Sequence, residues 1–141
     1  MPPKALPEDS IAFVIKAGTA TITPQTHPIV SVTVDTQVNK IAKATIVVED
    51  GEKATREFAV CNSHIFAIGE NITIEAGYGQ TLFPIFEGII VKQGLCTKYL
   101  TDATLVIECR HAAYRTTLVP HTCSFSTKTD ADVINEILLA Y

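Results

Sequence analysis

The chain has 141 residues, of which 47% are hydrophobic and 18% charged, and its formal net charge is −4. This length suits one domain that buries roughly two-thirds of its unfolded surface. Lysine and arginine do not cluster along the sequence, so nucleic-acid binding, which needs several grouped cations, is not expected. The mean hydropathy of +0.25 with so few charges predicts either a fully enclosed core or apolar surface offered to partners, and the second is favoured.

The first ten residues hold three prolines and mixed charges, which is typical of a flexible leader before an ordered domain at 11–141. This leader lacks the apolar stretch of a signal peptide, and no apolar run is long enough to cross a bilayer. A cytoplasmic location is therefore expected.

Two patterns in the first third of the chain predict strands. Residues 11–15 form a compact apolar run, and valines alternate with polar residues from Val30 to Asp35, which indicates a half-buried strand that Val38 could extend. Residues 44–48 predict another strand, ending at Asp50-Gly51. Because Asp-Gly supports the positive φ angles of tight turns, residues 56–60 are expected to return as the hairpin partner.

The second half of the chain predicts further strands joined by glycine-marked turns. They are residues 72–76, 83–92, 104–110 and 119–126, with 93–103 as a hairpin connection. Pro84 suits the first position of a strand. Leu105, Ile107 and Cys109 alternate with polar or smaller residues, so they are expected to face the core.

One helix is predicted at the end of the chain. Thr129 fits an N-cap with Asp132 in the capping-box position, and Asp130 lies near the positive helix end. An apolar helix face follows, formed by Ile134, Ile137, Leu138 and Tyr141. The sequence stops with this face complete, so a fragment of a longer protein is expected. Together the elements predict a mainly β fold: an antiparallel β-barrel or rolled sheet of about seven or eight strands with a C-terminal helix.

Three groups of residues could carry chemistry, and each has a structural interpretation that is favoured. Asp132 and Glu136 lie one helical turn apart and could act as acid and base or hold a metal, but carboxylates also stabilise a helix N-terminus. Cys109 could be a thiolate activated by Arg110 with His111 as base, but its place on the apolar strand face predicts a buried thiol beside the surface charges of Glu108 and Arg110.

The third group combines cysteines and histidines. His64 and His121 lie near Cys61 and Cys123, but the spacing does not predict the four converging ligands of a zinc site. The four cysteines, which include Cys96, could form two disulfides, although free thiols are favoured without a signal sequence. Gly77, Gly79 and Gly88 match turns rather than phosphate-binding loops. No catalytic, cofactor-binding or metal-binding residue is therefore predicted.

Five short patterns follow one another along the chain. They are residues 39–46 with Glu49-Asp50-Gly51, residues 62–69, Gly77-Tyr78 with residues 86–90, Glu108-Cys109-Arg110 with Ala113, and residues 129–134. In these patterns and their order the chain resembles the first domain of VgrG-type spike proteins and related phage tail baseplate hub proteins (late control gene D-like).

The resemblance implies a non-enzymatic hub or spike component of a contractile injection apparatus, of the type VI secretion or phage-tail kind, that connects the tail tube to the puncturing needle. The resemblance also implies that the full-length protein forms a homotrimer and that its partners are Hcp-like tail-tube proteins, baseplate proteins and effectors. It implies membrane contact only by puncture of the target, and export by contraction without a signal peptide. The alternative is a stand-alone β-barrel module that binds oligonucleotides or carbohydrates. The lack of tryptophan and the scattered tyrosines weigh against that module.

Overall fold

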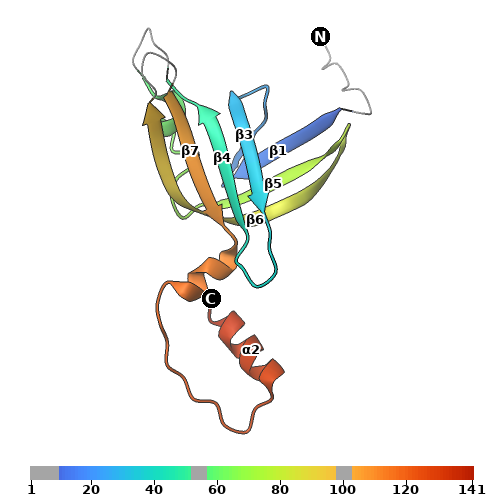
Figure 1. The fold of residues 1–141 in the computed structure, drawn as a ribbon, viewed down its shortest axis with the longest axis vertical. Coiled ribbons are helices and arrows are strands. Elements are labelled where there is room, and N and C mark those ends of the chain that lie inside the picture. Colours follow the sequence, from blue (N-terminus) through green and yellow to red (C-terminus); the bar gives the residue numbers. More distant parts are fainter. Residues whose placement is uncertain (1–9, 52–56, 98–102) are drawn as a thin grey trace.

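A computed structural model describes residues 10–51, 57–97 and 103–141, and its main feature is one antiparallel sheet of seven strands (Figure 1). In sheet order the strands are β2 (Ala20–Ile22), β1 (Ile11–Ala17), β5 (Asn71–Tyr78), β6 (Thr81–Thr97), β7 (Ala103–Arg110), β4 (Lys43–Glu49) and β3 (Ile29–Asp35). The sheet rolls around its core without closing, and β2 and β3 are its two edges. The predicted mainly β fold with about seven strands and a C-terminal helix is confirmed.

The roll of the sheet depends on β6, which spans 17 residues and pairs with β5 over its first half and β7 over its second. Ile85 has no partner on β5, and the register shifts again after Ile90. Such bulges bend a strand and increase its twist. Pro84 lies beside the first bulge and is the fourth residue of β6 rather than its first. This half of β6 does not pair with β7, so the missing backbone N–H of Pro84 costs no hydrogen bond to β7.

The core is formed by one face of each strand. Every second residue of β7 is buried, so the prediction that Leu105, Ile107 and Cys109 face inward is confirmed. The other large, fully buried side chains are Ile15, Ile22, Ile46, Val48, Phe66, Ile72, Ile74 and Ile90. Phe66 comes from the segment before β5, which hydrogen-bonds to β6 through Gly69 N and Ile90 O at 2.8 Å.

The segment after β4 differs from the predicted hairpin. Both sides of β4 are occupied by β3 and β7, and the chain instead forms a short helix, α1 (Ala59–Asn62). Asp50 is buried, and its carboxylate accepts hydrogen bonds from the amides of Val60 and Cys61. The predicted strand 56–60 is therefore wrong over residues 59–60, because Asp50 binds the first turn of a helix. Residue 56 lies outside the described residues.

Other differences concern short elements and strand ends. The strand β2 was not predicted; it follows a turn in which Gly18 adopts a φ of +56°. The strand β3 ends at Asp35 and does not reach Val38, whereas β6 continues to Thr97 through part of the predicted connection, and residues 98–102 are not described. A 3₁₀ helix, η1 (Ala112–Thr117), follows β7. The predicted strand 119–126 is wrong: these residues run away from the sheet, so they have no neighbour to pair with (Figure 1).

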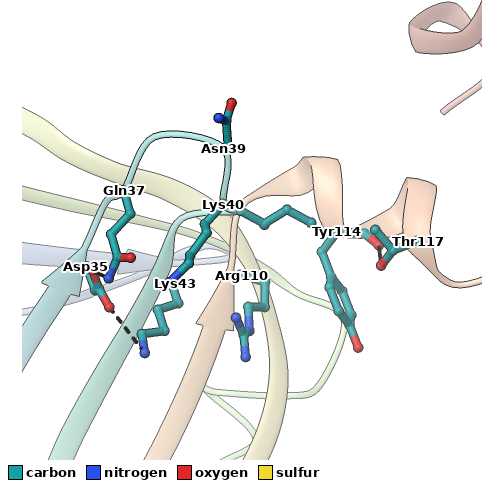
Figure 2. Close-up of a pocket in the computed structure, with 9 residues that line it drawn as sticks. Asp35, Gln37, Asn39, Lys40, Lys43, Arg110, Tyr114 and Thr117 are labelled. Atoms are coloured by element: carbon teal, nitrogen blue, oxygen red, sulfur yellow. Dashed lines mark hydrogen bonds and ion pairs between the residues drawn. The ribbon is translucent and has the colours of Figure 1, made fainter.

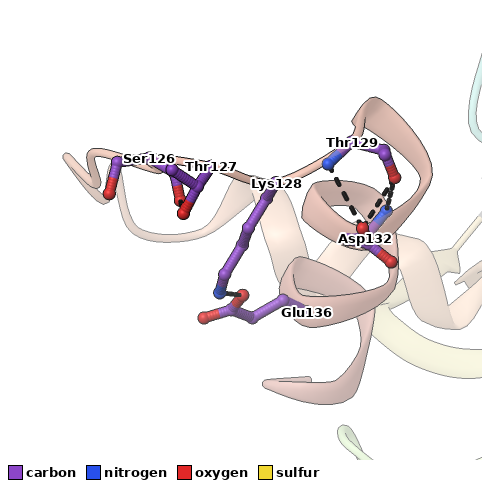
Figure 3. A network of polar contacts seen from close by, with 6 residues as sticks. All are labelled: Ser126, Thr127, Lys128, Thr129, Asp132 and Glu136. Atoms are coloured by element: carbon purple, nitrogen blue, oxygen red, sulfur yellow. Dashed lines mark hydrogen bonds and ion pairs between the residues drawn. The ribbon is translucent and has the colours of Figure 1, made fainter.

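The final helix, α2 (Asp130–Leu139), begins as predicted. Thr129 and Asp132 form the reciprocal hydrogen bonds of a capping box (Figure 3). The helix lies apart from the sheet, and its predicted apolar face is exposed, including Ile134 and Leu138. Residues 1–9 of the predicted flexible leader lie outside the described residues.

Candidate functional site

The two helix carboxylates, for which the structural interpretation is favoured over an acid–base pair, have separate structural partners. Asp132 accepts hydrogen bonds from the hydroxyl and the amide of Thr129, and these bonds lower the pKa of its carboxyl below the ordinary value of 3.8. Glu136 forms an ion pair with Lys128 (Figure 3). Each carboxylate therefore serves the helix or its entry loop.

The Cys109 thiol lies in the core, where burial raises its pKa to about 12. A thiol with that pKa is protonated at neutral pH and is a poor nucleophile. The neighbouring residues also have other partners: Nδ1 of His111 accepts a 3.2 Å hydrogen bond from the Ala113 amide, and Glu108 pairs with Lys92 at 3.0 Å. The structure thus supports the core interpretation of Cys109.

The cysteines and histidines considered as a metal site, Cys61, Cys123, His64 and His121, are not grouped as one. All four cysteines are free, and among the described residues no three histidine, cysteine, aspartate or glutamate side chains are grouped to hold a metal ion. In the same part of the chain, no helix has the length and apolar character needed to cross a membrane.

The strongest candidate site is a pocket of about 480 Å³ on the outer face of the sheet, where β3 and β7 end and β4 begins. We call it the basic pocket. Its lining residues are Asp35, Gln37, Asn39, Lys40, Ile41, Lys43, Arg110, Tyr114 and Thr117. Three cations thus meet one carboxylate in a chain whose net charge is negative.

The register of the sheet brings three lining residues of this pocket together. Asp35 pairs with Lys43 across β3 and β4, and Lys43 pairs with Arg110 across β4 and β7. Residues directly opposite each other point to the same face, so all three side chains lie in one row. The side chains of Lys43 and Arg110 extend in the same direction as the ring of Tyr114, which η1 supplies (Figure 2).

Hydrogen bonds and charge fix one side of the basic pocket. Nζ of Lys43 lies 3.2 Å from the Asp35 carboxylate, which also accepts a 3.0 Å hydrogen bond from Gln37. The bond from Gln37, followed by that from Lys43, lowers the pKa of Asp35. The turn after β3 adds Lys40, whose amide donates to the Gln37 carbonyl oxygen; in that turn Asn39 has a left-handed φ of 61°.

No local pattern in the sequence indicates this pocket, because its cations are spread over residues 40–110 and only strand pairing brings them together. A partial signal did exist. Lys43 directly precedes the predicted strand 44–48 and Arg110 ends the predicted strand 104–110, so pairing those strands antiparallel would have brought the two cations close together.

Residues 7–141 match the family described as the Alg8 N-terminal domain. No curated protein matches the chain.

This match contradicts the resemblance to VgrG-type spike and phage baseplate hub proteins. For the same reason, the predicted structural role in a contractile injection apparatus is wrong, and so is the trimeric hub with Hcp-like partners. The match does not support the alternative stand-alone binding module either. The prediction of a non-enzymatic protein is also wrong, because the matched family points to a domain associated with an enzyme, a glycosyltransferase. The cytoplasmic location stays a prediction.

Proposed function

Because the chain belongs to the Alg8 N-terminal domain family, we propose that it is the N-terminal domain of a glycosyltransferase. The observation that carries this proposal is the match over residues 7–141, which includes every described strand and helix. In this proposal residues 11–141 form one domain of a longer enzyme.

We propose that the domain holds the transferase part of the enzyme in place and does not itself perform the transfer step. The thiol of Cys109 is enclosed in the core, and the carboxylates of Asp50 and Asp132 bind backbone amides at helix starts. These groups, which would be natural candidates for acid–base or nucleophilic chemistry, stabilise the fold. Such a domain supports catalysis by holding the transferase part in place.

The apolar face of α2 is the proposed contact with the rest of the enzyme. Ile134 is 56% exposed and Leu138 58% exposed, and Ile137 lies next to Ile134 on the same face. Because each of these side chains is about half exposed, burying the rest of it would contribute about 1 kcal/mol. Exposed apolar patches usually mark interfaces, and the position of α2 away from the sheet leaves this face accessible (Figure 1).

The test is sugar transfer from a nucleotide-sugar donor by the full-length protein, compared with the double variant Ile134→Ser/Leu138→Ser. We expect transfer by the wild type and a large loss in the variant, since the face could no longer pack on the transferase part. Leu139→Ser is the matched control, because Leu139 is 88% exposed and lies on another side of the helix.

Two results would contradict the proposal. A full-length wild-type protein that transfers no sugar from any nucleotide-sugar donor would reject the glycosyltransferase assignment. A double variant as active as the wild type would reject the role of α2. Unfolding of the isolated 1–141 chain should be equal in all three proteins, because α2 adds no residue to the core.

A further inference from the structure

The basic pocket places two cations directly opposite each other. Lys43 and Arg110 are cross-strand partners on the same face, and like charges in such a pair destabilise a sheet. The carboxylate of Asp35 compensates Lys43. Within the described residues, no carboxylate pairs with Arg110, which is half-buried between the strand ends. The row therefore has an unbalanced positive charge at Arg110.

A third cation strengthens this imbalance. Lys40 lines the same pocket from the exposed turn after β3, and its ammonium forms no ion pair with the described residues. Its charge attracts Asp35 at longer range. Since Asp35 already faces Lys43, Lys40 and Arg110 leave an excess of positive charge that an anion could balance.

We propose that the basic pocket binds the phosphate group of a small, soluble phosphate monoester. A guanidinium donates two parallel hydrogen bonds to phosphate oxygens, and a lysine ammonium adds a point charge. A phosphate monoester carries close to two negative charges at neutral pH, which matches the excess better than one carboxylate does. The volume of about 480 Å³ exceeds the need of phosphate alone, and Ile41 and Tyr114 provide apolar wall for an organic group.

The proposed ligand site does not depend on the sugar-transfer role, and it can be tested on the 141-residue chain. Glycerol 3-phosphate and inorganic phosphate are titrated at low salt, with binding followed by calorimetry and by amide chemical shifts of residues 37–43 and 110–117. We expect Arg110→Gln and Lys40→Gln each to weaken binding at least about tenfold. Arg110→Lys should also bind more weakly, because it loses the paired donors.

Lys16→Gln is the matched control: Lys16 is an exposed lysine on β1 with its own partner, Glu75, and its loss should leave phosphate binding unchanged. Lys40 lies in an exposed turn, so Lys40→Gln tests the site even if Arg110→Gln unfolds. Absence of binding by the wild type, or equal binding by Lys40→Gln, would overturn the proposal.

Two further arms test the ligand class and its source. Tighter binding of succinate than of glycerol 3-phosphate would overturn the preference for phosphate. Vesicles of phosphatidylcholine containing phosphatidic acid present the same group on a lipid. Binding to these vesicles without binding of glycerol 3-phosphate would overturn the soluble ligand, whereas the reverse result would support it.

Discussion

The carboxylate of Asp50, at the end of β4, accepts a 2.7 Å hydrogen bond from the backbone amide of Cys61 in α1. Its second oxygen accepts a 3.0 Å bond from the amide of Val60, and the amide of Asp50 itself donates to the Ala103 carbonyl oxygen at the start of β7. One buried residue, only 2% exposed, therefore ties α1 to two neighbouring strands.

We expect Asp50→Ala to lower the free energy of unfolding by about 1–3 kcal/mol, because two half-buried helix amides lose their buried acceptor. Glu49→Ala removes a similar carboxylate from the adjacent exposed position and should change stability by less than about 0.5 kcal/mol. Urea unfolding of the three proteins measures both values. Equal loss in the two variants would contradict the capping role.

Gly88 and Gly94 lie on the same strand, β6, in different surroundings. A Cβ at Gly88 would meet the carbonyl oxygen of Arg110 at 2.2 Å, whereas nothing lies within 4 Å of a Cβ at Gly94. We expect Gly88→Ala to destabilise the fold by about 1–3 kcal/mol through backbone displacement. Gly94→Ala should be neutral or stabilising by about 0.5 kcal/mol, since it restricts the unfolded chain. Thermal unfolding that ranks the two variants in the opposite order would refute this difference.

Cys109 should resist alkylation in the folded protein. The thiolate is the reactive form, and burial both raises the pKa of Cys109 to about 12 and blocks access. With iodoacetamide at pH 8, the exposed Cys96 and Cys123 should be modified first, as peptide mass spectrometry can show. After denaturation all four cysteines should react. Early labelling of Cys109 in the native state would argue against a closed core.

The start of α2 should be sensitive to acid. Hydrogen bonds from Thr129 lower the pKa of Asp132, so the stabilisation from this cap is fully present above the ordinary value of 3.8. It is lost as the pH falls below that value through the pKa of the folded state. The amide shift of Thr129 followed by NMR should titrate with a midpoint below 3.8. Asp132→Asn should abolish this titration, and Asp130→Asn should retain it; a midpoint above 3.8 would contradict the cap.

The strands β3 and β7 were predictable because the sequence pattern that indicates each of them is local. Alternating valines in β3 and the Leu105–Ile107–Cys109 face of β7 repeat every two residues, as a half-buried strand requires. The capping box of Thr129 and Asp132 is equally local. In contrast, Asp50-Gly51 has the composition of a hairpin turn, but no hairpin follows it. Since β4 pairs with β3 on one edge and β7 on the other, no edge is left for a hairpin partner, and the Asp50 carboxylate caps α1.

The family assignment shows a different limit. The patterns that resemble hub proteins are mostly strand alternations, turn glycines and a helix cap, which occur in many unrelated proteins with antiparallel strands and a helix. Such features predict a fold and do not identify an activity. The family match to the Alg8 N-terminal domain was therefore needed to correct the function, although the predicted fold class was right.

The sequence by itself determined six of the seven strands, the apolar face of β7 and the residue at which α2 begins, because these depend on neighbours within a few positions. Only the tertiary structure decided how the sheet rolls, which residues Asp50 binds and that Lys40, Lys43 and Arg110 share a pocket. These outcomes depend on strand order and register, which bring together residues as far apart as 43 and 110. Local periodicity carries no information about such distant pairings, and the charge of the basic pocket arises from them.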